Sequence, residues 1–143
     1  MKLPTAREIN PNAADVDFDG GHAERHFLGK TLEEAEALFR ENSIYYQEDL
    51  MWMGPVGFRF YVRAAINYLR SDAATGDSGM VHAFVGLLGF WLEFHPKELV
   101  PVAAELAAAC ASLRAEYDRF DVAPEIYGDL RPRLQSLEES LRR

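Results

Sequence analysis

The chain has 143 residues, a formal net charge of −8, 48% hydrophobic residues and 27% charged residues. These values are typical of one globular domain and exclude a largely disordered chain. The acidic balance argues against a nucleic-acid-binding face, because phosphate contacts need clustered Lys and Arg, and it argues against docking on anionic membranes. The single cysteine excludes an intrachain disulfide, and no apolar run reaches the length of a membrane span. We therefore expect a cytoplasmic protein.

Residues 1–30 are polar and contain several glycines and prolines. We interpret them as an extended or looped N-terminal arm, partly ordered by packing of Phe18, Phe27 and Leu28. The helical domain is expected to span residues 31–143.

The first predicted helix begins after Thr31, because Thr31 and Glu34 match a capping box. Apolar residues then recur at a spacing of three or four, which predicts one apolar stripe. The pair Asn42-Ser43 is a plausible end, although the pattern also allows the helix to continue through Tyr46.

The next two predicted helices follow a proline and a loop. Pro55 suits a first helical turn, where its missing N–H costs nothing, and apolar residues continue to Leu69. Residues 71–79 have loop composition, with Asp77 or Ser78 as a helix N-cap. A third helix is predicted over about residues 80–94.

A fourth helix is predicted from about Pro101 to Phe120, where apolar residues recur every three or four positions. Cys110 lies on this stripe, which indicates a buried structural thiol. The residues from Asp129 to Leu141 predict a final helix with a leucine stripe. The pattern indicates an all-α protein, an irregular bundle of about five helices with no strand.

The segment from Tyr45 to Leu69 holds seven of the chain's 17 aromatic residues. Its second half has helical spacing and predicts core. Its first half has no clean period and mixes large apolar side chains with carboxylates, ahead of two arginines, which is typical of ligand sites and interface hot spots. The alternative is a solvated corner of an ordinary core. The candidate binding surface consists of Tyr45, Tyr46, Glu48, Asp49, Trp52, Arg59 and Arg63.

Alternating aspartates followed by glycine resemble the start of an EF-hand calcium loop, in which oxygens at alternate positions surround a hard cation. The candidate ligands for calcium or another divalent metal are Asp15, Asp17, Asp19 and Glu24. The twelfth position of such a loop is His26, where that family needs a glutamate. The alternative is an acidic turn without metal.

Two histidines of the same region, His22 and His26, are four residues apart. On a helix they would share a face and could bind zinc. Because no third ligand is evident, solvated histidines are the favoured interpretation.

The segment Met53–Ala65, MGPVGFRFYVRAA, resembles a segment of small uncharacterised bacterial helical proteins of unknown function. In those proteins a proline precedes Phe-Arg-Tyr-Tyr, and an apolar stretch with Pro-Ala follows. Here Phe60 replaces the first tyrosine and Arg63 replaces the later proline. The resemblance implies a bacterial domain without assigned catalytic residues, and small helical proteins of this kind are sometimes immunity or partner-binding proteins.

The acidic charge, the aromatic segment and the lack of a coherent catalytic set favour a non-enzymatic protein-interaction module, with an immunity-like role as one form of it. The alternative is a metal-binding protein or metal-dependent enzyme that uses the Asp- and His-rich N-terminal segment. Self-association through the aromatic segment or the last helix is a third hypothesis. The orientation of Trp52 discriminates between a core and a binding surface.

Overall fold

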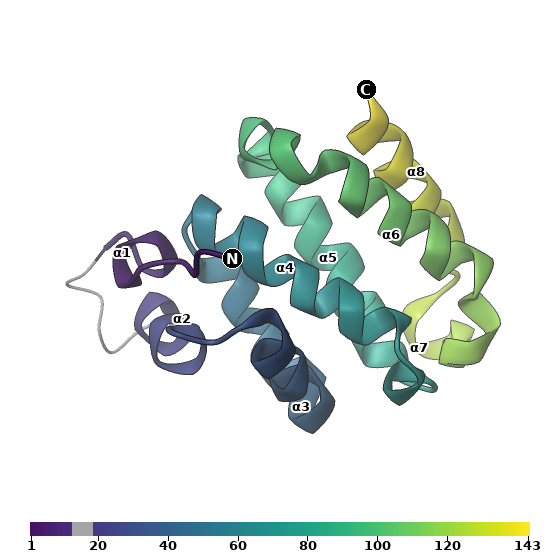
Figure 1. Cartoon of the computed structure of the whole chain (residues 1–143). Coiled ribbons are helices and arrows are strands. Elements are labelled where there is room, and N and C mark those ends of the chain that lie inside the picture. Colours follow the sequence, from purple (N-terminus) through teal and green to yellow (C-terminus); the bar gives the residue numbers. More distant parts are fainter. Residues whose placement is uncertain (13–18) are drawn as a thin grey trace. The chain divides into compact units, whose positions relative to one another are not determined.

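A computed structural model describes residues 1–12 and 19–143 of the chain and shows helices and no strand in these ranges (Figure 1). The all-α prediction is confirmed, but the predicted count of about five helices is wrong, since the described residues form eight α-helices. Those missing from the prediction are α1 (Ala6–Ile9), α2 (Asp19–Phe27) and α7 (Pro124–Tyr127). Each is too short for an apolar period to reveal it.

The chain divides into two units, residues 1–68 and residues 69–143. The first unit contains α1, α2, α3 (Leu32–Trp52) and most of α4 (Pro55–Arg70). The second contains the end of α4 and the elements η1 (Asp72–Ala74), α5 (Ser78–Phe94), η2 (Pro96–Val102), α6 (Ala103–Ala115), η3 (Tyr117–Phe120), α7 and α8 (Arg131–Arg142). No helix of the described ranges combines the length and the apolarity that a membrane crossing needs.

Two capping boxes begin helices of the first unit. The predicted one is confirmed, because the Thr31 hydroxyl accepts from the Glu34 N–H and the Glu34 carboxylate accepts from the Thr31 N–H. The same reciprocal pair joins Thr5 and Glu8 at the start of α1. The sequence pattern Thr-x-x-Glu could therefore have predicted α1 as well.

A break in α3 falls at Asn42, whose φ of −159° and ψ of 85° lie outside the helical region. The Asn42 side-chain oxygen accepts a hydrogen bond from the Tyr45 N–H at 3.2 Å, which is the geometry of an N-cap. The predicted end at Asn42 thus marks a real interruption, after which the chain becomes helical again up to Trp52. The first half of the aromatic segment, up to Trp52, consequently lies on the helical stretch that follows the break, and its second half lies on α4 (Pro55–Arg70).

The core of the first unit is built around Phe27 of α2. Its ring centroid lies 5.9 Å from that of Phe39 on α3 and 5.0 Å from that of Tyr61 on α4, and all three side chains are fully buried. The Tyr61 hydroxyl lies 2.8 Å from the carbonyl oxygens of both Phe27, the last residue of α2, and Lys30, in the turn that follows. These contacts fix α2 against α3 and α4.

Close backbone contact explains the glycines around Pro55. The Gly54 N–H donates to the carbonyl oxygen of Ile9 at 2.9 Å. A Cβ atom at Gly57 would lie 3.0 Å from the Glu8 carbonyl oxygen and 3.1 Å from the Ile9 Cα. Because only glycine leaves this space, α1 can pack directly on the start of α4.

In the second unit, α8 packs along α6 (Figure 1). The predicted leucine stripe of α8 is confirmed, with Leu134, Leu137 and Leu141 buried. Arg114 of α6 pairs with Glu138 of α8 at 2.8 Å. The predicted cap of α5 is also confirmed, because the Asp77 carboxylate accepts from the backbone N–H three residues later.

Candidate functional site

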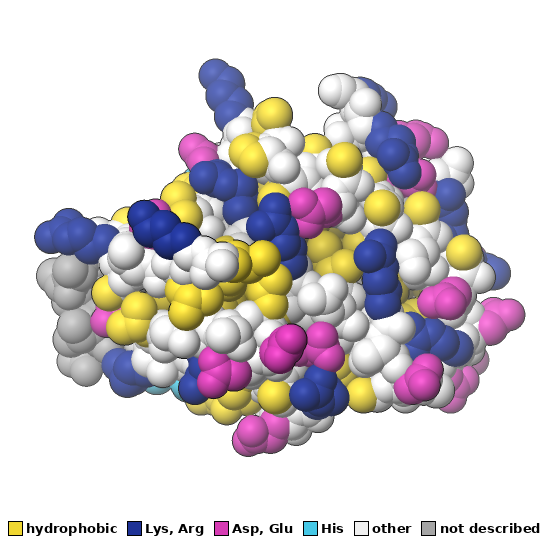
Figure 2. All heavy atoms as spheres, in the orientation of Figure 1, with side chains coloured by type: hydrophobic (Ala, Val, Ile, Leu, Met, Phe, Trp, Pro, Cys, Tyr) yellow, Lys and Arg dark blue, Asp and Glu magenta, His cyan; other side chains and the backbone are white. Residues whose placement is uncertain are grey.

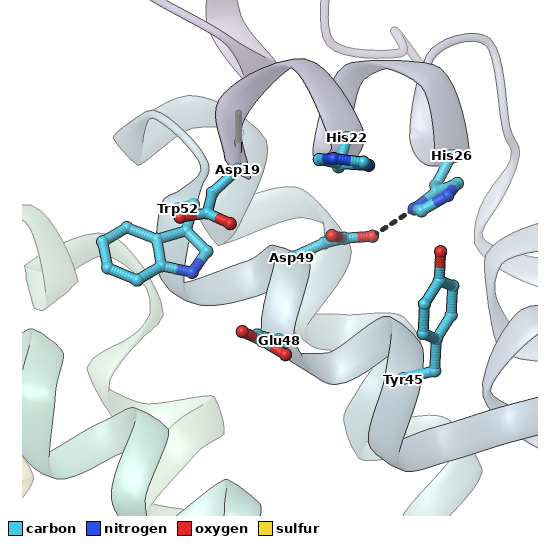
Figure 3. A pocket seen from close by; sticks show the side chains of 7 residues that line it. All are labelled: Asp19, His22, His26, Tyr45, Glu48, Asp49 and Trp52. Atoms are coloured by element: carbon cyan, nitrogen blue, oxygen red, sulfur yellow. Dashed lines mark hydrogen bonds and ion pairs between the residues drawn. The ribbon is translucent and has the colours of Figure 1, made fainter. Parts of the chain in front are cut away.

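A pocket of about 170 Å³ lies in the first unit, between α2 and the part of α3 that follows the break (Figure 3). Each helix contributes residues three, four or seven positions apart, which is the spacing of one helical face. The lining residues are Asp19, His22, His26, Tyr45, Glu48, Asp49 and Trp52.

A second face of α2, beside the pocket-lining one, packs in the core and holds this helix in place. Gly20, Ala23 and Phe27 are buried, whereas the pocket-lining positions between them are exposed or half-buried. Glycines disfavour a helix in isolation, which made α2 doubtful from sequence. Tertiary packing of the small residues overrides that preference.

The centre of the pocket is a hydrogen bond between the two helices. His26 Nδ1 and Asp49 Oδ2 lie 2.6 Å apart, and the Asp49 side chain is only 10% exposed. Because an ionised carboxylate only accepts, the imidazole N–H donates to Asp49. Burial raises the pKa of Asp49, and the hydrogen bond from His26 opposes this shift.

The other carboxylate oxygen of Asp49 is available to the pocket. Within the described part of the chain, the Asp49 side chain makes no hydrogen bond except the one to His26. Figure 3 shows its carboxylate between the two helices, with one oxygen turned away from His26. A largely buried carboxylate therefore has one oxygen in position to accept a hydrogen bond from a bound group.

Two aromatic side chains flank this carboxylate. Tyr45 is 52% exposed and its ring centroid lies 5.4 Å from that of His26. Trp52 is 43% exposed and lies beside Asp19 at the other end of the pocket (Figure 3). Trp52 is thus a rim residue and not part of the core.

The pocket includes some of the predicted binding residues and omits others. Four of them, on successive turns of α3, line it. Tyr46 is half-buried and packs its ring against Phe27 and His26. Arg59 and Arg63 are half-buried on α4 and do not line it, so the expected combination of carboxylate and guanidinium does not occur there.

The predicted metal ligands are dispersed or lie outside the described residues, as Asp15 and Asp17 do. Asp19 lines the pocket, whereas Glu24 points elsewhere on α2 and accepts a hydrogen bond from Asn10 at 3.4 Å. In the described ranges, no group of three or more His, Cys, Asp or Glu side chains is arranged to hold a metal ion.

His22 and His26 of α2 line the pocket, whereas the sequence favoured their interpretation as solvated histidines. The relevant signal was the spacing of Asp19, His22 and His26, which matches one helical face. Arg25 adds a contact at the rim, where its Nη2 lies 3.0 Å from His22 Nδ1. Since a guanidinium only donates, this ring nitrogen of His22 accepts and carries no proton.

The lining of the pocket is acidic and aromatic, with two histidines beside the carboxylates. Three carboxylates and two aromatic faces line it, and among its described lining residues none is Lys, Arg, Ser, Thr or Cys. On the face of the molecule drawn in Figure 2, by contrast, acidic and basic side chains are interspersed. A lining of this kind favours attraction of a positive group.

Comparisons with protein-family models, curated proteins and solved structures found no match to this chain. The resemblance of Met53–Ala65 to bacterial helical proteins stays a prediction. An all-α fold with an open, acidic and aromatic pocket is therefore the basis for a functional assignment.

Proposed function

We propose that this chain is a non-enzymatic protein-interaction module that binds a basic protein through the pocket between α2 and α3. The observation that carries the proposal is the pocket itself, in which half-exposed Tyr45 and Trp52 flank the carboxylates of Glu48 and Asp49. Aromatic side chains next to charged groups are typical of interface hot spots.

The charge of the whole chain supports a basic partner. A net charge of −8 attracts positively charged proteins and raises their association rate. Bacterial origin, cytoplasmic residence and an immunity-like role belong to the same proposal, and the resemblance of Met53–Ala65 supports them.

A metal-binding protein is the alternative function, and Asp19 with its neighbouring histidines is the observation in its favour. Calorimetric titration with calcium, zinc and manganese tests it. Saturable binding below millimolar concentration would favour this alternative, whereas its absence removes it.

Affinity enrichment from cells of the source organism tests the interaction proposal. The immobilised wild-type chain is compared with the pocket variant Trp52→Ala/Glu48→Gln. A matched control, Phe94→Ala/Glu125→Gln, changes the same kinds of exposed side chain in the second unit.

We expect a basic protein to be retained by the wild type and by the control but lost from the pocket variant. Calorimetry with the purified partner then measures the affinity of each variant. Retention of the same proteins by all three chains would contradict the assignment of the pocket.

A further inference from the structure

We infer that the pocket between α2 and α3 receives the guanidinium head of one arginine side chain. The inference rests on the proposed function and specifies what the basic partner presents to this pocket.

One carboxylate oxygen of Asp49 is in position to accept a hydrogen bond from a bound group. Its side chain is nine-tenths buried, His26 donates to one oxygen, and no described residue donates to the other. This oxygen borders the open pocket, and a positively charged donor forms a stronger hydrogen bond with a carboxylate than a neutral donor does. The N–H groups of a cation entering the pocket would supply that donor.

The volume of the pocket selects a small group. About 170 Å³ is below the roughly 300–1,000 Å³ of pockets for drug-sized ligands. A pocket of this volume accommodates the head of one side chain.

The walls favour arginine over lysine. A guanidinium is planar, stacks on aromatic faces and donates in pairs to carboxylates, whereas an ammonium is a compact and strongly hydrated charge. Tyr45 and Trp52 offer the aromatic faces, and Glu48 and Asp19 lie around Asp49 (Figure 3).

The second unit contains an arginine held by the same combination of groups. Arg131 donates from Nε and Nη2 to the two oxygens of Asp129, at 2.9 Å and 3.0 Å. Its guanidinium carbon lies 5.1 Å from the ring centroid of Tyr117. The pocket presents a carboxylate and aromatic rings in the same way, but none of its described lining residues is an arginine.

NMR titration with blocked single amino acids tests the inference directly. The probes are the Nα-acetyl methylamides of arginine, lysine and citrulline, the last being a neutral analogue of arginine. We expect saturable millimolar binding of the arginine probe at residues of α2 and α3. We also expect binding about tenfold weaker for the lysine probe and no saturation with the citrulline probe.

Two pocket variants and one control accompany the titration. Asp49→Asn should weaken binding of the arginine probe strongly, and Glu48→Gln, at an exposed position, should weaken it severalfold even if Asp49→Asn fails to fold. Glu125→Gln, exposed in the second unit, should leave binding unchanged. Equal binding of the arginine and citrulline probes, or equal affinities in wild type and both pocket variants, would overturn the inference.

Two further results separate this inference from the proposed function. Replacing the contacting arginine of the recovered partner by lysine should weaken the complex about tenfold; an unchanged affinity would overturn the inference while the interaction function stands. Free L-arginine and agmatine test the other source of a guanidinium. If either binds far more tightly than the blocked probe, the ligand is a metabolite and a protein side chain is excluded.

Discussion

Asp49 is a largely buried carboxyl group that accepts a hydrogen bond from His26. Burial raises the pKa of its carboxyl, and the hydrogen bond from His26 lowers it. The carboxylate has therefore lost part of its hydration without a full replacement. A cation that contacts it gains more than it would from an exposed carboxylate, and the same property makes the site sensitive to pH.

The first prediction concerns pH. Arginine binding should weaken as pH falls through the raised pKa of Asp49, because protonation removes the negative charge that attracts the guanidinium. His22 and His26 face the same pocket. Asp19 and Glu48 also line it. Affinities of the arginine probe from about pH 4 to about pH 8 provide the measurement.

A flatter pH profile in Asp49→Asn, measured through whatever weak binding persists, would assign the effect to this carboxyl. The variant His22→Gln/His26→Gln separates the contribution of the imidazoles. A profile that is the same in wild type and Asp49→Asn would show that Asp49 does not carry the pH dependence.

The second prediction concerns Tyr61, whose hydroxyl ties the end of α2 to α4. Burial raises the pKa of Tyr61 to about 12, so the hydroxyl keeps its proton and donates at neutral pH. Tyr61→Phe should lower the free energy of unfolding by about 1–2 kcal/mol, because the carbonyls of Phe27 and Lys30 lose a donor. Urea unfolding followed by circular dichroism measures the change. Tyr45→Phe, at an exposed position, should alter stability by less than about 0.5 kcal/mol.

At the scale of elements, the α3 half of the site was predictable, whereas the spacing of His22 and His26 indicates a shared face only if a helix forms there, and the sequence did not predict that helix. The predicted end at Asn42 coincides with the break in α3. Because the chain becomes helical again after the break, the apolar spacing of the residues before it does not continue into the residues after it. In α2, by contrast, nine residues with two adjacent glycines have little intrinsic helicity. Contacts of Phe27 with Phe39 and Tyr61, distant in sequence, create this helix, and no local pattern records them.

The third prediction compares two glycines that both lie inside helices. Glycine to alanine inside a helix should add about 0.5–1 kcal/mol of stability when nothing obstructs the new methyl group. Gly86 of α5 meets this condition, since no neighbouring atom lies within 4 Å of the point that a Cβ would occupy. At Gly57 of α4 the methyl would instead meet the Glu8 carbonyl oxygen at 3.0 Å and force α1 away.

We therefore expect Gly86→Ala to raise and Gly57→Ala to lower the free energy of unfolding. Chemical denaturation of both variants measures the two signs. A stabilised Gly57→Ala variant would show that α1 does not pack on α4 in solution.

At the scale of the whole molecule, charge separates a basic partner from a second copy of this chain. Two copies each carrying a net charge of −8 repel one another at neutral pH. Pairing through the pocket would also bring like-charged carboxylates together, which is unfavourable. A positively charged protein is not repelled by the net charge of the chain and brings no further carboxylates to the pocket.

The last prediction follows from this difference. The chain should be monomeric near pH 7.5 and should begin to associate as the pH approaches the isoelectric point near 5.0, where the mutual repulsion vanishes. Light scattering at high protein concentration measures this, and Trp52→Ala should not change the result at neutral pH. A dimer at pH 7.5 that Trp52→Ala dissociates would instead identify the half-exposed Trp52 rim as a surface for self-association. Because repulsion of like charges decays over about 10 Å at 0.1 M salt, the comparison is sharpest at low ionic strength.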